Sequence, residues 1–337
     1  MFRFTHFTAA PALVLLLSGT AHAALTADQV WQSWKDGAGL VGLQVSAATE
    51  SNSGGVLTLN GVSIAPPGEQ NAIKISDMTL AEQADGSVVI TPGAAIGLDG
   101  SADGGGKFDL VHEGLVITAH EGEGGALVYD YSANSLKATI DASFEGYSFD
   151  PNTPAQRVTS LIDASFEGLN GSYSDTPGTN RAFDLVLNAT KFGYDITSDD
   201  PNLKQKQVQK SETSDVAMSG TLTLPATMAL TAIQGPGDFA KALADGLAVK
   251  LTTKQGGSTG SVTQEDEFFP MQFDMTAQGG TAALSFDNTA FSVVSDAPGM
   301  TMNITSSAIP APVEVNIGPV VMDFLLPVVA ATPADYH

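Results

Sequence analysis

Apolar and polar residues alternate with a period of two over much of the chain, for example at 136–145, 183–190 and 271–275. Such segments are typical of strands that bury one face and leave the other in water. Turn-forming pairs separate them: Asp85-Gly86, Asp99-Gly100, Glu113-Gly114, Asn170-Gly171 and Gly279-Gly280. The pattern predicts a mainly all-β fold, an elongated or curled antiparallel meander with units of roughly 8–10 residues.

Two short segments have a helical pattern instead. The first, near residues 26–36, begins with a capping box in which Thr26 and Gln29 satisfy the first free N–H groups. Glycines at 37 and 39 are expected to end it. The second helix is expected near residues 238–245, after the sequence Gly-Pro-Gly.

The string IDASFEG occurs twice, at 140–146 and 162–168. Within one copy, Asp141 and Glu145 would lie about 13 Å apart along a strand. Carboxylate pairs in acid–base catalysis usually lie about 5–10 Å apart, so a repeated scaffold strand is favoured over a repeated catalytic site. Isoleucine, alanine and phenylalanine are expected to face inward in both copies. If the copies pair, their outward carboxylates are expected to repel and to raise each other's pKa.

The first 23 residues have the features of a secretory signal peptide. Arg3 precedes a short apolar run at 9–17, and Ala21-His22-Ala23 is an A-x-A cleavage signature. The run is too short to span a membrane. We therefore expect cleavage after Ala23 and a periplasmic mature protein.

The mature chain is expected to be divided into an N-terminal β-rich region at 24–235 and a second region at 236–337. The second region contains the second predicted helix and further strands. We expect it to continue the first region and to be incomplete at its C-terminus.

The chain is strongly acidic, with a formal net charge of −23 that becomes −24 when Arg3 is removed with the leader. Such a polyanion is repelled by nucleic acid and by bare anionic membranes, and no nucleic-acid partner is expected. The chain has no cysteine, so no disulfide stabilises it. Its one basic cluster, Lys204, Lys206 and Lys210, alternates with glutamines, which is typical of a solvated strand at a sheet edge.

One glycine-rich stretch resembles the start of a calcium-binding loop. Asp99 and Asp103 occupy ligand positions of the D-x-[DN]-x-[DN]-G pattern. The bidentate acid expected at the twelfth position is replaced by Leu110, and Asp109 comes one residue early. A plain glycine-rich loop is favoured, and Asp99, Asp103 and Asp109 remain weak metal candidates. No cofactor is expected.

Two other motifs point weakly to enzymes. His112 and His120 each precede Glu-Gly and resemble a pair of metal ligands. If both lay on the same strand, however, they would be about 26 Å apart, too far to share a metal. We instead expect Glu113-Gly114 to form a tight hairpin that pairs 110–112 with 115–117. Residues 256–260 match the letters of the G-x-S-x-G nucleophile elbow, yet no helix is predicted after Ser258. A flexible loop is favoured.

The C-terminal third is the most apolar part of the mature chain. Residues 319–331 are interrupted by prolines and contain Asp323, so a buried strand followed by a turn is expected. Methionines are concentrated here: Met271, Met275, Met300, Met302 and Met322. Methionine adapts to irregular apolar contacts, including acyl chains, although core packing is its commoner role.

Four stretches carry a family resemblance: LTADQVWQSW at 25–34, FAKALADGLAVKL at 239–251, FDMTAQGGTAALSFDNTAFSVVS at 273–295 and AIPAPVEVNIGPVVMDFLLPV at 308–328. Together they resemble the alphaproteobacterial exported family labelled domain of unknown function 2125. The resemblance implies export and no catalytic residues. Members of that family continue past the LLPV segment, so this chain resembles a C-terminally truncated member with an unpaired sheet edge.

These observations favour a non-enzymatic periplasmic β-protein that holds a lipid or other apolar ligand in a curled sheet. A structural or interaction protein of the cell envelope, with a closed core, is the alternative. A hydrolase is the least favoured of the three. An open apolar groove would favour the first class, and a closed sandwich would favour the second.

Overall fold

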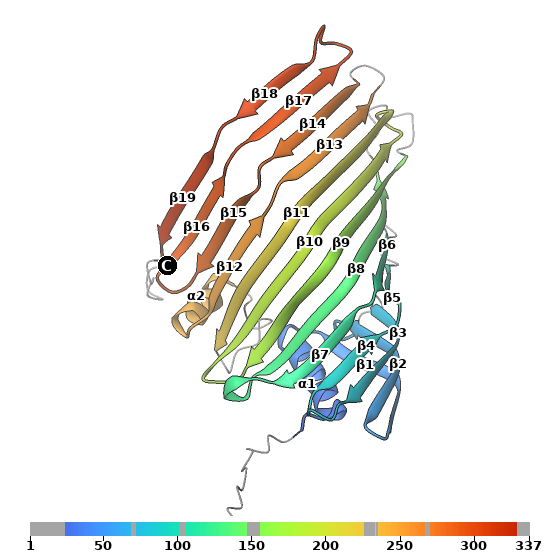
Figure 1. The fold of residues 1–337 in the computed structure, drawn as a ribbon, viewed down its shortest axis with the longest axis vertical. Coiled ribbons are helices and arrows are strands. Elements are labelled where there is room, and N and C mark those ends of the chain that lie inside the picture. Colours follow the sequence, from blue (N-terminus) through green and yellow to red (C-terminus); the bar gives the residue numbers. More distant parts are fainter. Residues whose placement is uncertain are drawn as a thin grey trace, which may run out of the picture.

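The computed structural model describes residues 24–68, 72–100, 106–146, 156–225, 233, 235–266 and 270–328. The predicted leader therefore lies outside the described residues. The described chain folds into a single sheet of nineteen antiparallel strands with two α-helices (Figure 1). The predicted all-β meander is confirmed.

The strands fall into three groups along the chain. The first contains β1 (Gln44–Ser53), β2 (Val56–Ala65), β3 (Ile73–Glu82), β4 (Val88–Pro92), β5 (Ala95–Gly100), β6 (Gly106–Glu113) and β7 (Val116–Glu121). The central group contains β8 (Leu127–Glu145), β9 (Arg157–Thr176), β10 (Asn180–Asp200) and β11 (Gln205–Pro225). The last contains β12 (Ala248–Gln255), β13 (Ser258–Glu265), β14 (Met271–Ala277), β15 (Gly280–Phe286), β16 (Ala290–Ala297), β17 (Met300–Ser306), β18 (Val313–Ile317) and β19 (Val320–Pro327).

The central strands are about twice as long as the sequence pattern suggested, with 19–21 residues each. Several predicted turns lie inside strands or between collinear strands. Asn170-Gly171, for example, lies within β9. A side chain at Gly171 would collide with the Val186 carbonyl oxygen and the Tyr131 hydroxyl. This glycine therefore permits close approach of neighbouring strands, and it does not form a turn.

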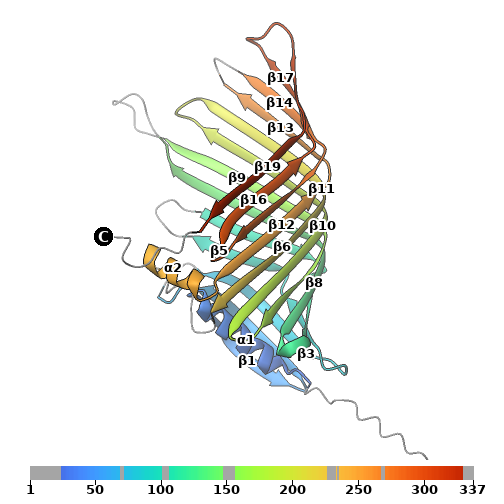
Figure 2. The same cartoon turned by 90° about the vertical axis from the view of Figure 1, so that its left-hand side faces the viewer.

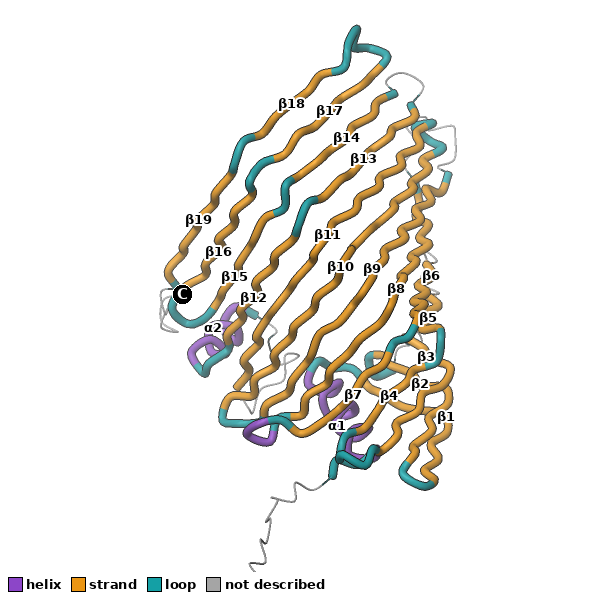
Figure 3. The backbone as a smooth tube through the Cα atoms, in the orientation of Figure 1, coloured by secondary structure: helices purple, strands orange, loops and turns teal. Residues whose placement is uncertain are grey.

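A line of ladder interruptions and strand breaks crosses the sheet from β1 to its far edge, and we call it the crease. Between β8 and β9, for instance, the ladder skips Asn134 and Gly168. The breaks in the later strands are aligned in Figure 3. The crease contains Ala48, Gly61, Gly93, Gly114, Asn134, Gly168, Thr190, Asp215, Gly256, Gly279, Gly299 and Gly318. Several of these residues, such as Gly61, Gly114 and Gly168, have a positive φ. The ladders keep the same register on both sides of the crease, so neighbouring strands are interrupted together and remain paired.

The crease also explains why the predicted hairpin at Glu113-Gly114 is wrong. Strands β6 and β7 do not pair with each other; both pair with β8, one after the other along its length. Gly114 has a φ of 66° and lies against Asn134. The Glu-Gly pair therefore forms a break between collinear strands and does not reverse the chain.

The two IDASFEG copies lie on the adjacent strands β8 and β9, with Ile140 opposite Ile162. Register and alternation place Ile, Ala and Phe of both copies on one face of the sheet, which we call the groove face. The copies run antiparallel, so Asp141 lies opposite Leu161 and Asp163 lies opposite Thr139. The repeat is paired scaffold.

The expected repulsion between the repeated carboxylates is wrong for Asp163. Its Oδ1 accepts a hydrogen bond from the Thr139 hydroxyl at 2.6 Å and lies 3.2 Å from the Lys137 Nζ. The hydrogen bond from Thr139, together with Lys137, lowers the pKa of Asp163. The outer face of the sheet thus balances its charges through cross-strand pairs.

Helix α1 (Ala27–Leu40) covers the groove face at one end of the sheet (Figure 2). The predicted capping box is confirmed, because Thr26 Oγ1 accepts from the Gln29 N–H at 3.2 Å and Gln29 Oε1 accepts from the Thr26 N–H at 2.8 Å. Val30 and Trp31 are buried against a core contributed mostly by β1–β4. This core contains Leu57, Leu59, Val62, Ile75, Met78, Leu80, Val88 and Ile90.

Helix α1 continues through the two glycines that were expected to end it. Each glycine inside a helix costs about 1 kcal/mol relative to alanine, which a packed helix tolerates. The helix ends at Leu40, where the Val41 N–H bonds to the carbonyls of Ala38 and Gly39. Gly42, with a φ of 76°, then redirects the chain.

Helix α2 (Pro236–Ala244) lies on the same groove face, where Ala242 and Leu243 belong to a cluster with Leu224 of β11 and Phe286 of β15. Its Phe239 ring stacks on Phe286, with ring centroids 5.3 Å apart. The helix begins two residues earlier than predicted because Pro236 occupies its first turn, where a missing N–H costs nothing.

The segment 319–327 is not the buried strand that its composition suggested. It forms β19, which pairs with β16 on one side only among the described residues. Val321 is 72% exposed and Leu325 is 63% exposed. A single-layered sheet buries its outermost strand on neither face unless another element covers it, and no described element does so here.

The crease predicts a specific sensitivity to substitution. Gly279 has a φ of 101°, and a Cβ there would lie 2.6 Å from the carbonyl oxygens of Gln255 and Gly256. We expect Gly279→Ala to lower the free energy of unfolding by about 1–3 kcal/mol, the usual cost of a strained backbone. Urea denaturation followed by circular dichroism measures it.

Gly318→Ala is the matched control, because it lies on the same crease and a Cβ there meets nothing within 4 Å. We expect it to stay within about 0.5 kcal/mol of the parent protein. Equal losses for the two variants would contradict the role given to the crease.

Candidate functional site

The main concave site is an apolar pocket on the groove face, which extends from α1 to just beyond the crease. Its volume is about 600 Å³. Helix α1 contributes Ser33, Trp34, Gly37 and Ala38, and the sheet contributes Val45, Ile64, Leu110, Leu115, Ile117, Tyr129, Tyr131, Leu136, Leu169, Tyr173, Asp175 and Leu187. This size and lining are typical of a site for a small apolar molecule.

A row of apolar residues leads from this pocket across the sheet. Strands β8, β9, β10, β11, β12, β15, β16 and β19 each contribute one residue to this row, and the strand register places these residues side by side: Tyr129, Tyr173, Leu185, Gly220, Leu251, Leu284, Val293 and Phe324. Aromatic contacts follow the row at both ends. One series runs from Trp31 to Phe183, and the other joins Phe239, Phe286, Phe291 and Phe324. The row contains no charged residue.

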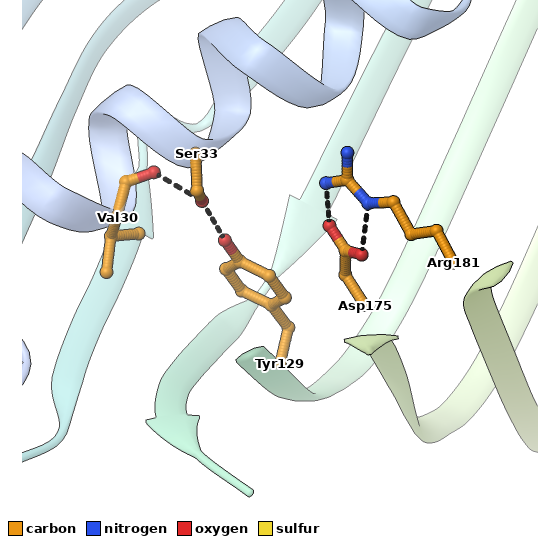
Figure 4. A network of polar contacts seen from close by, with 5 residues as sticks. All are labelled: Val30, Ser33, Tyr129, Asp175 and Arg181. Carbon is orange, nitrogen blue, oxygen red and sulfur yellow. Dashed lines mark hydrogen bonds and ion pairs between the residues drawn. The ribbon is translucent and has the colours of Figure 1, made fainter. Parts of the chain in front are cut away.

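Two polar groups at the wall of the pocket are already paired within the protein (Figure 4). The Ser33 hydroxyl donates to the Val30 carbonyl at 2.9 Å, so the Tyr129 hydroxyl is the donor to Ser33 Oγ at 2.7 Å. Asp175 accepts two hydrogen bonds from Arg181, one of them from Nε at 2.6 Å. Both members of the ion pair are mostly buried, and Asp175 raises the pKa of Arg181.

The tyrosines of the pocket are held in their neutral form. Burial raises the pKa of Tyr173 to about 12, with a smaller contribution from the negative charge of Asp175. Burial also raises the pKa of Tyr129 and of Tyr131. The Tyr131 hydroxyl donates to the Val186 carbonyl at 2.7 Å. Apart from the Asp175 carboxylate, which is paired with Arg181, the lining of the pocket is uncharged at physiological pH.

The weak metal candidates do not form a site in the described part of the chain. Asp103 and the side chain of Asp99 lie outside the described residues. Asp109 is exposed on the outer face of β6, opposite Gly97. The described residues contain no cluster of three or more side chains suited to a metal.

The two histidines lie on successive strands and bond to different partners. His112 Nε2 lies 2.8 Å from the Gly93 carbonyl oxygen, at the crease. His120 Nε2 lies 3.0 Å from a carboxylate oxygen of Asp130. The structure brings neither histidine together with Ser258, which lies in β13 opposite Ala277.

The G-x-S-x-G match is not an elbow, because strand β13 follows it where an elbow needs a helix. It is not a hairpin loop either. Gly256 and Gly257 form the crease between the collinear strands β12 and β13, and the Gly256 N–H bonds to the Ser214 carbonyl at 2.8 Å.

The basic cluster is a solvated strand face, as predicted, but it does not lie at a sheet edge. It lies in and just before β11, which pairs with β10 on one side and with β12 and β13 on the other. On this face Lys210 lies 3.3 Å from Asp195.

Sequence reasoning did not identify the pocket itself. Its lining comes from elements far apart in the chain, and α1 reaches it only through tertiary packing. The ion pair between Asp175 and Arg181 could have been predicted from the sequence. Its two opposite charges are six residues apart and flank a short turn between two strands.

Comparisons with known proteins give no relative. No family model matches the chain, and neither a curated protein nor a solved structure matches it. The resemblance to the exported family of unknown function stays a prediction. Neither α-helix in the described chain is both long and apolar enough to cross a membrane.

The raised pKa of Tyr173 predicts a pH dependence. A group whose pKa is raised by folding stabilises the native state fully below its ordinary pKa and loses that contribution as pH rises through the folded value. We expect stability to fall between pH about 10, the ordinary tyrosine value, and about 12. Phenolate absorbance and urea unfolding measure it.

Tyr173→Phe should remove the latest phenolate transition and reduce the alkaline loss of stability. In the urea-unfolded chain, all tyrosines should titrate together. An unchanged late transition in Tyr173→Phe would contradict the burial assigned to this side chain.

Proposed function

We propose that this protein is a non-enzymatic periplasmic protein that binds a lipid or other apolar ligand on the groove face of its bent sheet. The carrying observation is the pocket of about 600 Å³ under α1, which continues into an apolar row that ends at Phe324, a side chain 46% exposed. The described strands form a single sheet, and no second sheet among the described residues closes its apolar face.

Exposure of the groove face supports an apolar ligand. Ile140, Phe144, Met275 and Phe324 all lie on this face and are between 37% and 50% exposed. Large contiguous apolar surfaces are rare on soluble proteins unless they bind something. Covering them with acyl chains would gain roughly 25 cal/mol for each Å² removed from water.

The periplasmic address rests on the predicted leader and gains support from the first described residues. Ala24, which follows the predicted cleavage site, directly precedes the buried Leu25. The Leu25 N–H bonds to the Gly86 carbonyl at 3.1 Å. Cleavage after Ala23 would leave this anchor intact.

An interaction protein of the cell envelope is a second candidate, favoured by the exposed apolar edge strand β19. In that case the apolar surface would meet another polypeptide and would not hold a lipid. Ligand binding in the purified chain separates the two candidates.

Substitutions on neighbouring residues of β10 test the proposal. Leu187 lines the pocket, whereas Val186 points to the outer face and is 39% exposed. We expect Leu187→Gln to weaken binding of a fluorescent long-chain fatty acid about tenfold, since a buried amide without a partner costs roughly 1–3 kcal/mol. A fluorescence titration measures the affinity.

Val186→Gln is the matched control and should leave the affinity unchanged. Absence of saturable binding to the parent protein would refute the proposed ligand site. Equal weakening by both variants would place the binding elsewhere.

A further inference from the structure

The long dimension of the pocket follows the strands. Its lining extends along β8 from Tyr129 through Tyr131 to Leu136, a length of about 23 Å at 3.3 Å per residue. Across the strands, its floor runs from the collinear strands β6 and β7 through β8 and β9 to β10, a width of about 14 Å at 4.8 Å per pair. A site longer than it is wide fits an extended chain better than a compact fused ring.

Three polar side chains at the end under α1 already have partners within the protein. The hydroxyls of Ser33 and Tyr129 bond to each other, and the Asp175 carboxylate is held by both arms of Arg181. A charged head group placed there would lose its own hydration, and these paired groups would not replace it.

Exposure rises in the opposite direction along the strands. Tyr129, which lines the pocket at the α1 end and bonds to Ser33 of the helix, is 7% exposed. Beyond the crease, on the same groove face, Ile140 is 38% exposed and Phe144 is 50% exposed. A polar head at this end would stay in water while the chain behind it is covered.

We infer that an amphiphile with a linear acyl chain enters this site tail-first, with its methyl end beneath α1 and its polar head beyond the crease. The inference rests on the proposed function and adds the ligand class and its orientation. Both follow from the closed, internally satisfied α1 end and the open far end.

The two tryptophans of the chain provide a direct readout, because both lie in α1. Trp34 lines the pocket and Trp31 lies beside it, with ring centroids 6.4 Å apart. Bromine quenches tryptophan fluorescence only at close range. Two palmitic acids serve as probes, one brominated at its terminal carbon and one at the carbon next to its carboxyl group.

We expect the terminally brominated probe to cause the greater loss of tryptophan fluorescence at equal occupancy. Occupancy is measured separately by displacement of a fluorescent fatty acid. Trp34→Phe should reduce the difference between the probes, whereas Trp31→Phe, which keeps the tryptophan in the pocket wall, should preserve it. If Trp31→Phe does not fold, the parent protein and Trp34→Phe suffice for the comparison.

Equal or reversed quenching at equal occupancy would overturn the orientation and leave the proposed ligand site standing. Failure of both probes to displace the fluorescent fatty acid would overturn the proposed function, and the orientation with it.

Discussion

The alignment of strand breaks into one crease is the constraint on which the groove depends. The breaks in neighbouring strands lie side by side, from Gly61 in β2 to Gly318 between β18 and β19 (Figure 3). The ladders resume in the same register on both sides of the break. Neighbouring strands are therefore interrupted together, and the apolar face continues across the crease from the pocket under α1.

The helices divide the apolar face into a covered end and an open end. Helices α1 and α2 each cover part of the groove face. Val30 of α1, Ala242 of α2 and Leu224 of β11 are at most 2% exposed. No described element covers the face beyond the crease, and its side chains remain half-exposed. The outer face instead carries cross-strand ion pairs, such as Lys191 with Glu212 at 2.7 Å, each worth about 0–1 kcal/mol. This asymmetry of the two faces supports the proposal that an apolar ligand binds on the groove face.

Alternation in the sequence was enough to predict the all-β class, both helices and the common face of Ile, Ala and Phe in the IDASFEG repeat, because these depend on local periodicity. That face is less buried than expected, since Ile140 is 38% and Phe144 is 50% exposed. Strand length and the Glu113-Gly114 hairpin were predicted wrongly, since a glycine pair looks the same in a turn as in a strand break and only the partner strand distinguishes them. The exposure of β19 was also missed, because an apolar strand at a sheet edge has the composition of a buried one. The pocket joins residues as distant as Trp34 and Leu187, and no local pattern could bring them together.

Native mass spectrometry of the full chain, exported to and purified from a periplasm, tests the central claim most directly. The open groove face predicts a discrete added mass, which solvent extraction would release and identify as an acyl-chain amphiphile. A bare polypeptide mass from a well-folded sample, with no saturable uptake of added fatty acid, would contradict the account and favour an interaction protein of the envelope.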